Sequence, residues 1–420
     1  MITFLITALK IIFVLGFLIL IHEAGHFFVA KLCKVAVNEF SIGFGPIIWK
    51  KQGEKTKYTL RLIPLGGFVN LEGEEERSEK EDSYSKASIP KRMAIVIAGG
   101  LVNILFALIV YYCLMVSIGD YTSFIIEDVV PNYAAQNAGI QKNDQILKID
   151  NKKIYTKNDI DKIISNSKGK ELTLTIKRND EIKYITLIPT KQEYKSTGIY
   201  LKTTNSGDST EVLTVQAKSA AERAGIKAND EILKINQIEV KNQQEIVDII
   251  QNMKENELHF LLKRGNEQIE ISLVPDTQAM YYLGTYFKKA EDSLTNNLYY
   301  SLFETRDFVF SIVDNLKMLV IGNVRADQFM GPVGISEVVA NTNNLQDFVY
   351  ILALISLSLG VTNLLPIPAL DGGKVLLLLI EAIRRKKISE KVEINIQLIG
   401  FAILITLSLY ITYHDILRIL

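Results

Sequence analysis

The sequence predicts a polytopic α-helical membrane protein that also carries a duplicated module outside the membrane. Three observations predict this fold class. Four segments are long and apolar enough to cross a bilayer, for which about 20 residues are needed. The first segment contains the run His22-Glu23-Ala24-Gly25-His26, and the long block between the second and third segments contains an internal repeat. Together these features indicate a polar site inside the membrane and soluble domains beside it.

The four expected spans cover residues 3–30, 93–117, 348–367 and 394–414. The third is interrupted by Pro366 and Pro368. A proline-broken helix at membrane depth is tolerated only where it faces protein or a cavity. The break therefore points to a functional site.

His22 and His26 are four residues apart, so on a helix their imidazoles project from one face and can share a metal ion. Glu23 lies beside them as a candidate general base. Ionisable groups inside a bilayer are costly and usually line a site. The alternative, a chance occurrence of H-E-x-x-H on a soluble helix, is disfavoured by the apolar residues on both sides.

An apolar amino terminus can also be a secretory signal peptide, with Lys10 as its charged flank. Signal peptides are cut after small residues, and they carry no buried His or Glu. Leu32 directly before Cys33 argues against a lipoprotein cleavage site. We therefore expect a retained transmembrane helix.

The charge and cysteine content exclude other classes of protein. Lys plus Arg and Asp plus Glu are balanced at 47 each, so nucleic-acid binding has no support. The two cysteines, Cys33 and Cys113, fall at or in expected membrane helices, so no disulfide framework is implied.

Basic residues set the expected orientation, because cytoplasmic loops carry an excess of Lys and Arg. They flank the loop between the first two spans and lie between the last two, at Lys31, Lys34, Lys91, Arg92 and Arg384-Arg385-Lys386-Lys387. We expect residues 31–92 and 381–393 to be cytoplasmic and residues 118–347 to be extracytoplasmic.

The extracytoplasmic block contains the repeat. Residues 134–149 recur as residues 220–235 at an offset of 86, and the same offset carries Gly198-Ile199-Tyr200 onto Gly284-Thr285-Tyr286. Two tandem copies of one domain explain a constant offset over two separate stretches.

The repeated pattern A-x-x-A-G-[IL]-x-x-x-D-x-I-L-x-I resembles bacterial PDZ domains, and the resemblance implies two of them, at residues 122–204 and 208–290. PDZ domains bind an extended peptide as an added strand. A second interpretation stays open, in which the pair only blocks bulky proteins. Residues 291–345 are expected to form an amphipathic helix and a connector, and residues 1–118 and 346–420 the two membrane parts.

A catalytic zinc site normally has three protein ligands and an open position for water. His259 and His414 are badly placed for the third ligand. Asp371, in the run Asn363-Leu-Leu-Pro-Ile-Pro-Ala-Leu-Asp371-Gly-Gly, is an acid close to the proline break of this span. Its alternative role is helix capping beside the Gly-Gly turn.

H-E-x-x-H in the first span together with N-x-x-P-x-P-x-L-D-G-G in a later one resembles the site-2 protease family of intramembrane zinc metalloproteases. The tandem PDZ copies between the second and third spans match one branch of that family. Residues 41–46 and 63–69 match the family's membrane-re-entrant β-hairpin region, here residues 38–72.

The resemblance implies that His22, His26 and Asp371 bind Zn²⁺ and that Glu23 is the base. It also implies that Asn363 holds the substrate backbone or the developing oxyanion; a structural hydrogen bond in the bent helix is the alternative. The hairpin, with its glycines Gly43, Gly45 and Gly67, is expected to bind unwound substrate as an added strand, although these glycines could instead be loop punctuation.

The function implied by the resemblance is an endopeptidase of the bacterial inner membrane, with its active site toward the cytoplasm and its PDZ domains in the periplasm. Its substrates would be single-pass membrane proteins, such as anti-sigma factors and signal peptide remnants, after trimming by a site-1 type protease. A non-cleaving PDZ scaffold is the first alternative, but it has no need of three ligands and a base in lipid. A transporter is the second, but transporters often repeat membrane segments, and here the repeat is soluble.

Overall fold

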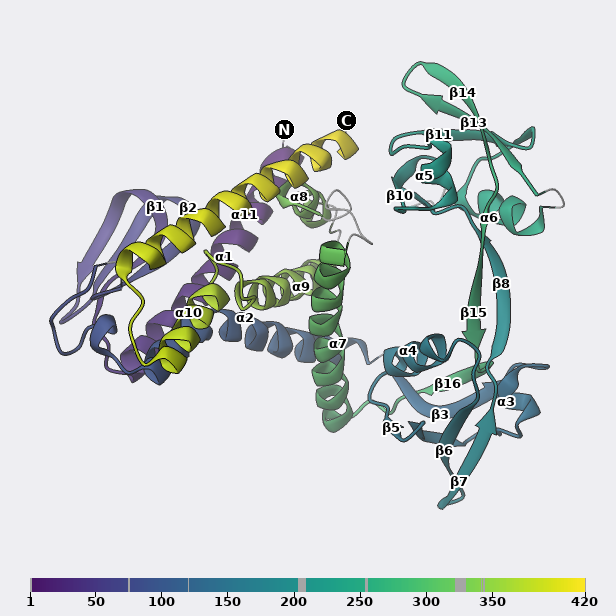
Figure 1. Ribbon diagram of the computed structural model, residues 1–420, viewed down its shortest axis with the longest axis horizontal. Coiled ribbons are helices and arrows are strands. Elements are labelled where there is room, and N and C mark those ends of the chain that lie inside the picture. Colours follow the sequence, from purple (N-terminus) through teal and green to yellow (C-terminus); the bar gives the residue numbers. More distant parts are fainter. Residues whose placement is uncertain are drawn as a thin grey trace. The chain divides into compact units, whose positions relative to one another are not determined.

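The computed structural model describes residues 2–74, 76–119, 121–202, 209–253, 256–321, 330–340, 342 and 344–419. These residues form two compact units. The first comprises the described residues up to 118 together with 308–313 and 330–415, and the second comprises most of residues 119–307 and 314–321 with a few residues after 415. Figure 1 colours the chain from its amino terminus in purple to its carboxyl terminus in yellow.

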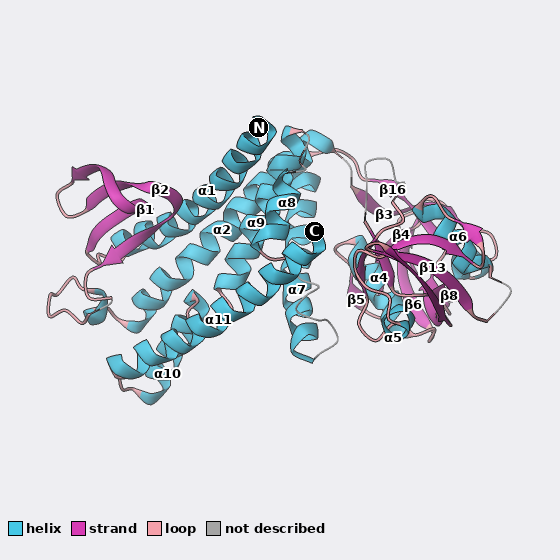
Figure 2. Cartoon of the chain, turned by 90° about the horizontal axis from the view of Figure 1, so that it is seen from above, coloured by secondary structure: helices cyan, strands magenta, loops and turns pink. Residues whose placement is uncertain are grey.

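The first unit is built on long helices. Four helices of the described chain are long and apolar enough to cross a membrane: α1 (Ile2–Leu32), α2 (Ile89–Ile118), α9 (Leu345–Asn363) and α11 (Glu390–Ile419). Figure 2 shows them in cyan. They match the four expected spans. Large apolar side chains on these helices, such as Leu105, Ile109 and Leu409, are exposed, which suits contact with lipid.

The prolines interrupt the third span as expected. Helix α9 ends at Asn363, and α10 (Asp371–Arg384) begins eight residues later. Pro366 and Pro368 lie between them, where proline cannot donate a helical hydrogen bond. The interruption thus places Asn363 at the end of one helix and Asp371 at the start of the next.

Strands β1 (Val37–Gln52) and β2 (Lys57–Leu71) form a long antiparallel hairpin where the re-entrant β region was expected. Its register is irregular, and glycines permit the irregularity. Gly43 and Gly45 have φ angles of +85° and +81°, which side chains rarely adopt. A Cβ on Gly67 would lie 2.5 Å from the carbonyl oxygen of Ser41 on the paired strand.

The base of the hairpin is attached to the helices by a buried apolar cluster. The cluster contains residues from α1, from both strands and from α2, namely Ala30, Val35, Val37, Leu71 and Ile95. A short 3-10 helix (Tyr84–Lys86) precedes α2. The end of β2 is thereby fixed relative to α1, which carries the two histidines.

The second unit contains two copies of one βα arrangement. The first copy has β3 (Thr122–Val129), α3 (Ala134–Asn137), β4 (Gln145–Ile149), β5 (Lys152–Lys153), α4 (Lys157–Ser167), β6 (Leu172–Arg178) and β7 (Glu181–Leu187). The second has β10 (Val212–Val215), α5 (Ala220–Ala224), β11 (Glu231–Ile235), β12 (Ile238–Glu239), α6 (Gln243–Asn252), β13 (Leu258–Arg264) and β14 (Glu267–Leu273).

Each copy encloses its own apolar core and preserves the same ion pair. In the first copy Arg178 Nη2 lies 2.6 Å from Asp144 Oδ2, and in the second Arg264 Nε lies 2.7 Å from Asp230 Oδ1. Both aspartates are fully buried. The aspartate that ends the turn before β4 or β11 is therefore neutralised inside its own copy.

Four further strands join the copies in a way that the repeat offset did not predict. β8 (Thr190–Ser196) pairs with β15 (Asp276–Tyr282). β9 (Ile199–Leu201) pairs with β10, whereas β16 (Thr285–Lys289) pairs back with β3. The second copy is thus inserted into the first.

The expected boundaries at residues 204 and 208 lie outside the described residues. The strand pairing nevertheless differs from that expected for two domains that follow one another along the chain. Residues 285–289, expected in the second domain, complete the sheet of the first. The reason is that an internal offset identifies equivalent segments without saying which sheet each strand joins.

Helix α7 (Leu294–Ile321) lies where the amphipathic helix was expected, and α8 (Pro332–Ala340) follows. The first part of α7 packs on the first copy, where the ring of Phe303 stacks on that of Tyr155 with their centroids 4.4 Å apart. Arg306 Nη2 also pairs with Asp159 at 3.0 Å. Packing on the repeat thus occupies this part of the helix.

Candidate metal centre and active site

Three predicted ligands, distant in sequence, meet in the first unit. His22 Nε2 and His26 Nε2 on α1 lie 3.2 Å apart. Asp371 Oδ2, at the first residue of α10, lies 3.1 Å from His22 Nε2 and 3.4 Å from His26 Nε2. Among the described residues these three form a group able to hold a metal ion. The proline-interrupted segment brings the aspartate to the histidines.

The donor set fits a zinc ion. Ligand atoms at about 2.0–2.2 Å from a tetrahedral zinc lie about 3.3–3.6 Å from each other, and the three separations here are close to that range. Asp371 Oδ2 is buried and receives no ordinary hydrogen bond from the described residues. Two imidazoles and one carboxylate are a donor set that zinc accepts.

The rings of both histidines are oriented through their other nitrogen. His26 Nδ1 lies 2.8 Å from the carbonyl oxygen of Ile95. Since a carbonyl only accepts, Nδ1 carries the proton and Nε2 keeps its lone pair for a metal. His22 Nδ1 lies 3.5 Å from the amide groups of both Asn103 and Asn363.

Asn103 is a site residue that sequence analysis missed. It is fully buried on α2, and its Oδ1 has no hydrogen-bond partner among the described residues. The two ends of an amide are told apart only by their partners. With the amide turned, Oδ1 accepts the proton of His22 Nδ1 and so orients the ring. The available signal was a lone asparagine in an otherwise apolar span.

The candidate base is held by the hairpin. The backbone N–H of Val69 on β2 donates to Glu23 Oε2 at 3.1 Å. This contact joins the hairpin to the residue between the two histidines. Because the partner is a backbone group, no residue type in the sequence announced it.

A glycine allows α2 to lie against the histidines. A Cβ on Gly99 would lie 2.4 Å from His26 Nε2 and 2.7 Å from His22 Nε2. Any side chain at this position would occupy the space of the metal centre. Gly99 was not singled out from the sequence, where it is one of two adjacent glycines in an apolar span.

The other expected site residues lie at different distances from this centre. Asn363 is beside His22, as given above. Gly67 lies two residues before Val69 on β2. Gly43 and Gly45 lie further along β1, where Arg61 Nη1 donates to the carbonyl oxygen of Gly45 at 2.9 Å.

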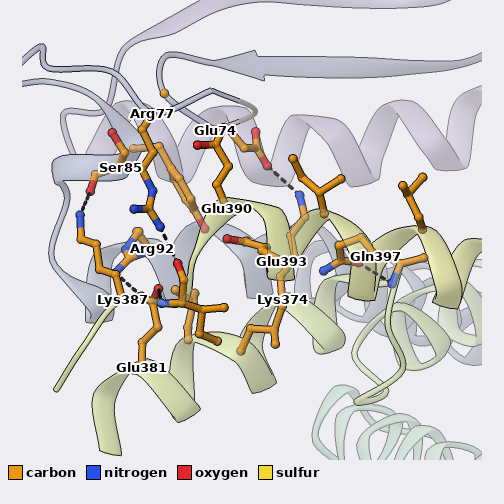
Figure 3. Close-up of a pocket in the computed structure, with 18 of the residues that line it drawn as sticks. Glu74, Arg77, Ser85, Arg92, Lys374, Glu381, Lys387, Glu390, Glu393 and Gln397 are labelled. Carbon is orange, nitrogen blue, oxygen red and sulfur yellow. Dashed lines mark hydrogen bonds and ion pairs between the residues drawn. The ribbon is translucent and has the colours of Figure 1, made fainter. Parts of the chain in front are cut away.

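A cavity of about 770 Å³ lies between the segments that carry Val69 and Ala369, and Figure 3 shows its charged side chains. Val69 and Ala369 line it on the side of the site. Ala369 has a φ of +74°, and its N–H donates to Gln397 Oε1 on α11 at 2.5 Å. This turn sets where α10, and with it the third ligand, begins.

Asn103→Ala should weaken zinc binding by about 10- to 100-fold, because it removes a partner that orients a ligating histidine. Competition with a chelator measures the affinity. Leu105→Ala, at an exposed position of the same helix, should leave it unchanged. Unaltered affinity in Asn103→Ala would contradict the role given to this amide.

Comparison with known proteins identifies the family of this chain. The model of peptidase family M50 matches residues 10–407. A Vibrio cholerae protein named as a zinc metalloprotease is 31% identical to this chain, over 97% of this chain and 98% of its own length. Proteins named regulator of sigma E protease are 29% identical in Haemophilus influenzae and 28% in Salmonella typhimurium, each over 97% of this chain and 98% of the relative.

Among solved structures, a PDZ domain of HtrA3 with a phage-derived ligand has a TM-score of 0.20 and 23% identity, over 22% of this chain and 93% of that one. The family match, by contrast, spans both membrane parts and includes the positions of the three candidate ligands. The chain therefore belongs to peptidase family M50, the site-2 family of zinc metalloproteases.

Proposed function

We propose that this protein is an intramembrane endopeptidase that cuts peptide bonds within or beside the transmembrane segments of single-pass membrane proteins. The observation that carries the proposal is the placement of the donor set. His22 and His26 lie on α1, a helix apolar enough to span a membrane, and they meet Asp371 at the start of α10, with Glu23 between the two histidines on α1. A site at that depth is accessible to a polypeptide in the bilayer.

In the proposed mechanism His22, His26 and Asp371 hold the zinc ion. Bound zinc supplies Lewis acidity, which lowers the pKa of water from about 15.7 to about 7. Glu23, fixed by the N–H of Val69, takes the proton of the attacking water and later delivers it to the leaving amine. Asn363 is proposed to donate to the substrate backbone or the developing oxyanion.

The substrate must unwind before it can be cut, because the carbonyls of a transmembrane helix are already hydrogen-bonded. We propose that the unwound segment adds as a strand to the β1–β2 hairpin, which would replace the lost hydrogen bonds. Two facts support this role. The hairpin is a two-stranded sheet, and its strand β2 contacts the candidate base through Val69. Gly43, Gly45 and Gly67 would permit the close backbone approach.

The names of the relatives suggest the type of partner. Two of them are called regulators of sigma E protease. We propose substrates of the anti-sigma factor or signal peptide remnant type, cut after a site-1 type protease has removed the outer domain. The bilayer of the bacterial inner membrane would be the environment of the reaction.

Glu23→Gln should retain zinc and lose proteolysis by at least about 100-fold, because the ligands remain and only the base is removed. Asp371→Asn should lower both zinc content and cleavage. Metal analysis of purified protein, combined with cleavage of a tagged single-span substrate, measures both quantities. Full cleavage by Glu23→Gln would refute the chemistry, and normal zinc content in Asp371→Asn would place the third ligand elsewhere.

We propose that the active site faces the cytoplasm and the repeat lies outside, following the distribution of basic residues. In a protein with Cys33 and Cys113 replaced by serine, a cysteine at Asp180, in an exposed turn of the repeat, should react from outside with a membrane-impermeant reagent. A cysteine at Glu81, before α2, should react only after the membrane is opened. The reverse pattern would overturn the orientation.

We propose that the repeat acts as a size filter that keeps bulky proteins away from the active site. The structure allows a clean excision, because the N–H of Ala290 donates to the carbonyl oxygen of Tyr121 at 2.7 Å. The chain thus enters and leaves the repeat at adjacent residues. Deleting residues 122–289, with a short glycine linker, should let the enzyme cut substrates whose outer domain is intact.

A second excision separates the two copies. Ser196 and Asp276 are paired across β8 and β15, so residues 197–275 can be replaced by a tight turn that leaves the first copy complete. If the repeat recruits substrate instead, either deletion should slow cleavage of a trimmed substrate, about tenfold for each 1.4 kcal/mol of lost binding. A variant that inserts normally yet still ignores untrimmed substrate would refute the filter.

A further inference from the structure

An ion pair beside the metal centre has no role in the chemistry described so far. Lys374 lies three residues after Asp371 on α10, close to one helical turn. Its Nζ is 2.8 Å from Oε1 of Glu74, which follows the end of β2. Figure 3 shows the two side chains meeting at the wall of the charged cavity. The lysine and glutamate side chains are 39% and 25% exposed, so the pair is partly shielded from solvent.

The glutamate stands on a fixed segment. Two residues before it, the carboxylate of Glu72 accepts hydrogen bonds from Ser78 at 2.6 Å and Asn38 at 3.1 Å and pairs with Lys80 at 3.0 Å. These donors lower the pKa of Glu72 to about 2. The backbone of Glu72 is also bonded on both sides, to Ala36 and Tyr84. Glu74 therefore projects from an anchored turn.

The lysine stands on a helix whose start has no cap of its own. Leu370, the residue before α10, provides no side-chain hydrogen bond to the first turn. Asp371 is the first residue of that helix, so its position depends on what holds α10. Pairing with Glu74 raises the pKa of Lys374 above its ordinary value.

The two partners belong to the two walls of the site. Glu74 continues β2, whose Val69 holds the base Glu23, and Lys374 continues the helix that begins with the ligand Asp371. We infer that Lys374 and Glu74 are a positioning pair, which sets the third ligand relative to the base. The inference rests on the proposed function, because it concerns the same site.

Other ties between the same segments provide matched controls. Arg77 Nη2 donates to the carbonyl oxygen of Ile388 at 2.6 Å, and Lys387 Nζ donates to that of Ser85 at 2.7 Å. Both ties line the same cavity but hold the linker between α10 and α11 rather than the start of α10. If the Lys374–Glu74 pair only held the segments together, removing either of these two hydrogen bonds would have the same effect on zinc binding and cleavage as removing the pair.

The test uses two single variants, Lys374→Met and Glu74→Gln, and one double variant in which the two residues are exchanged, Lys374→Glu together with Glu74→Lys. The control variants are Arg77→Met and Lys387→Met. Each full-length variant is purified, and its folding is checked by thermal unfolding. Zinc affinity is measured by chelator competition, and kcat and KM with a tagged single-span substrate. We expect each single variant of the pair to weaken zinc binding by about tenfold and to lower kcat by about tenfold, with KM unchanged. Tenfold is the low end of the range for groups that orient a metal ligand.

The exchange variant should recover most of the loss, and the two controls should bind zinc and cleave as the wild type does. Wild-type zinc affinity and kcat in a folded Lys374→Met protein would overturn the inference. So would equal losses in Arg77→Met, or no recovery in the exchange variant. If the wild type binds zinc but cuts no membrane substrate, the proposed function fails and the affinity comparison still decides the role of the pair.

Discussion

The cost of placing ionisable groups among apolar helices governs the first unit. A buried carboxylate or imidazole needs a partner for each polar atom, because no water replaces a missing one. Each of the four side chains of the site lies against groups from another element. Backbone groups of α2 and β2 bind His26 and Glu23, amides on α2 and α9 lie beside His22, and Asp371 faces both imidazoles. The elements around the site are therefore part of its chemistry.

Close backbone packing follows from the same constraint. Gly99 lets α2 touch the two histidines, and a Cβ on Gly360 of α9 would lie 2.6 Å from the carbonyl oxygen of Gly100 on α2. Small residues at such contacts are how membrane helices approach when no hydrophobic force drives them together. The approach brings the carbonyl of Ile95 within reach of His26. The glycines thus contribute to the site by the absence of a side chain, which lets the helices pack closely around it.

The sequence predicted those parts of the molecule that depend on residue type and local spacing. The four spans, the break at Pro366 and Pro368, and the two copies of the repeat are features of this kind. The convergence of Asp371 on the two histidines was expected from a motif, whereas the contact of Val69 with Glu23 involves a backbone N–H that every residue except proline possesses. Asn103 was missed because only its tertiary contacts separate it from an ordinary polar residue. The insertion of one copy into the other was missed because strand pairing over a long separation leaves no local pattern.

The nested arrangement of the repeat has a consequence for how the chain folds. β3 cannot complete its pairing until β16 has been made. Val129 of β3 pairs with Thr285 of β16, and these two residues are about 156 positions apart in the sequence. The inserted copy contains all of its own strands between them, so it can fold while the outer copy is still open. Closing so long a loop costs little more free energy than closing a shorter one, but distant contacts slow folding. During synthesis, the outer copy therefore keeps an open sheet edge until β16 has been made, and an unpaired sheet edge is prone to pairing with the wrong strand.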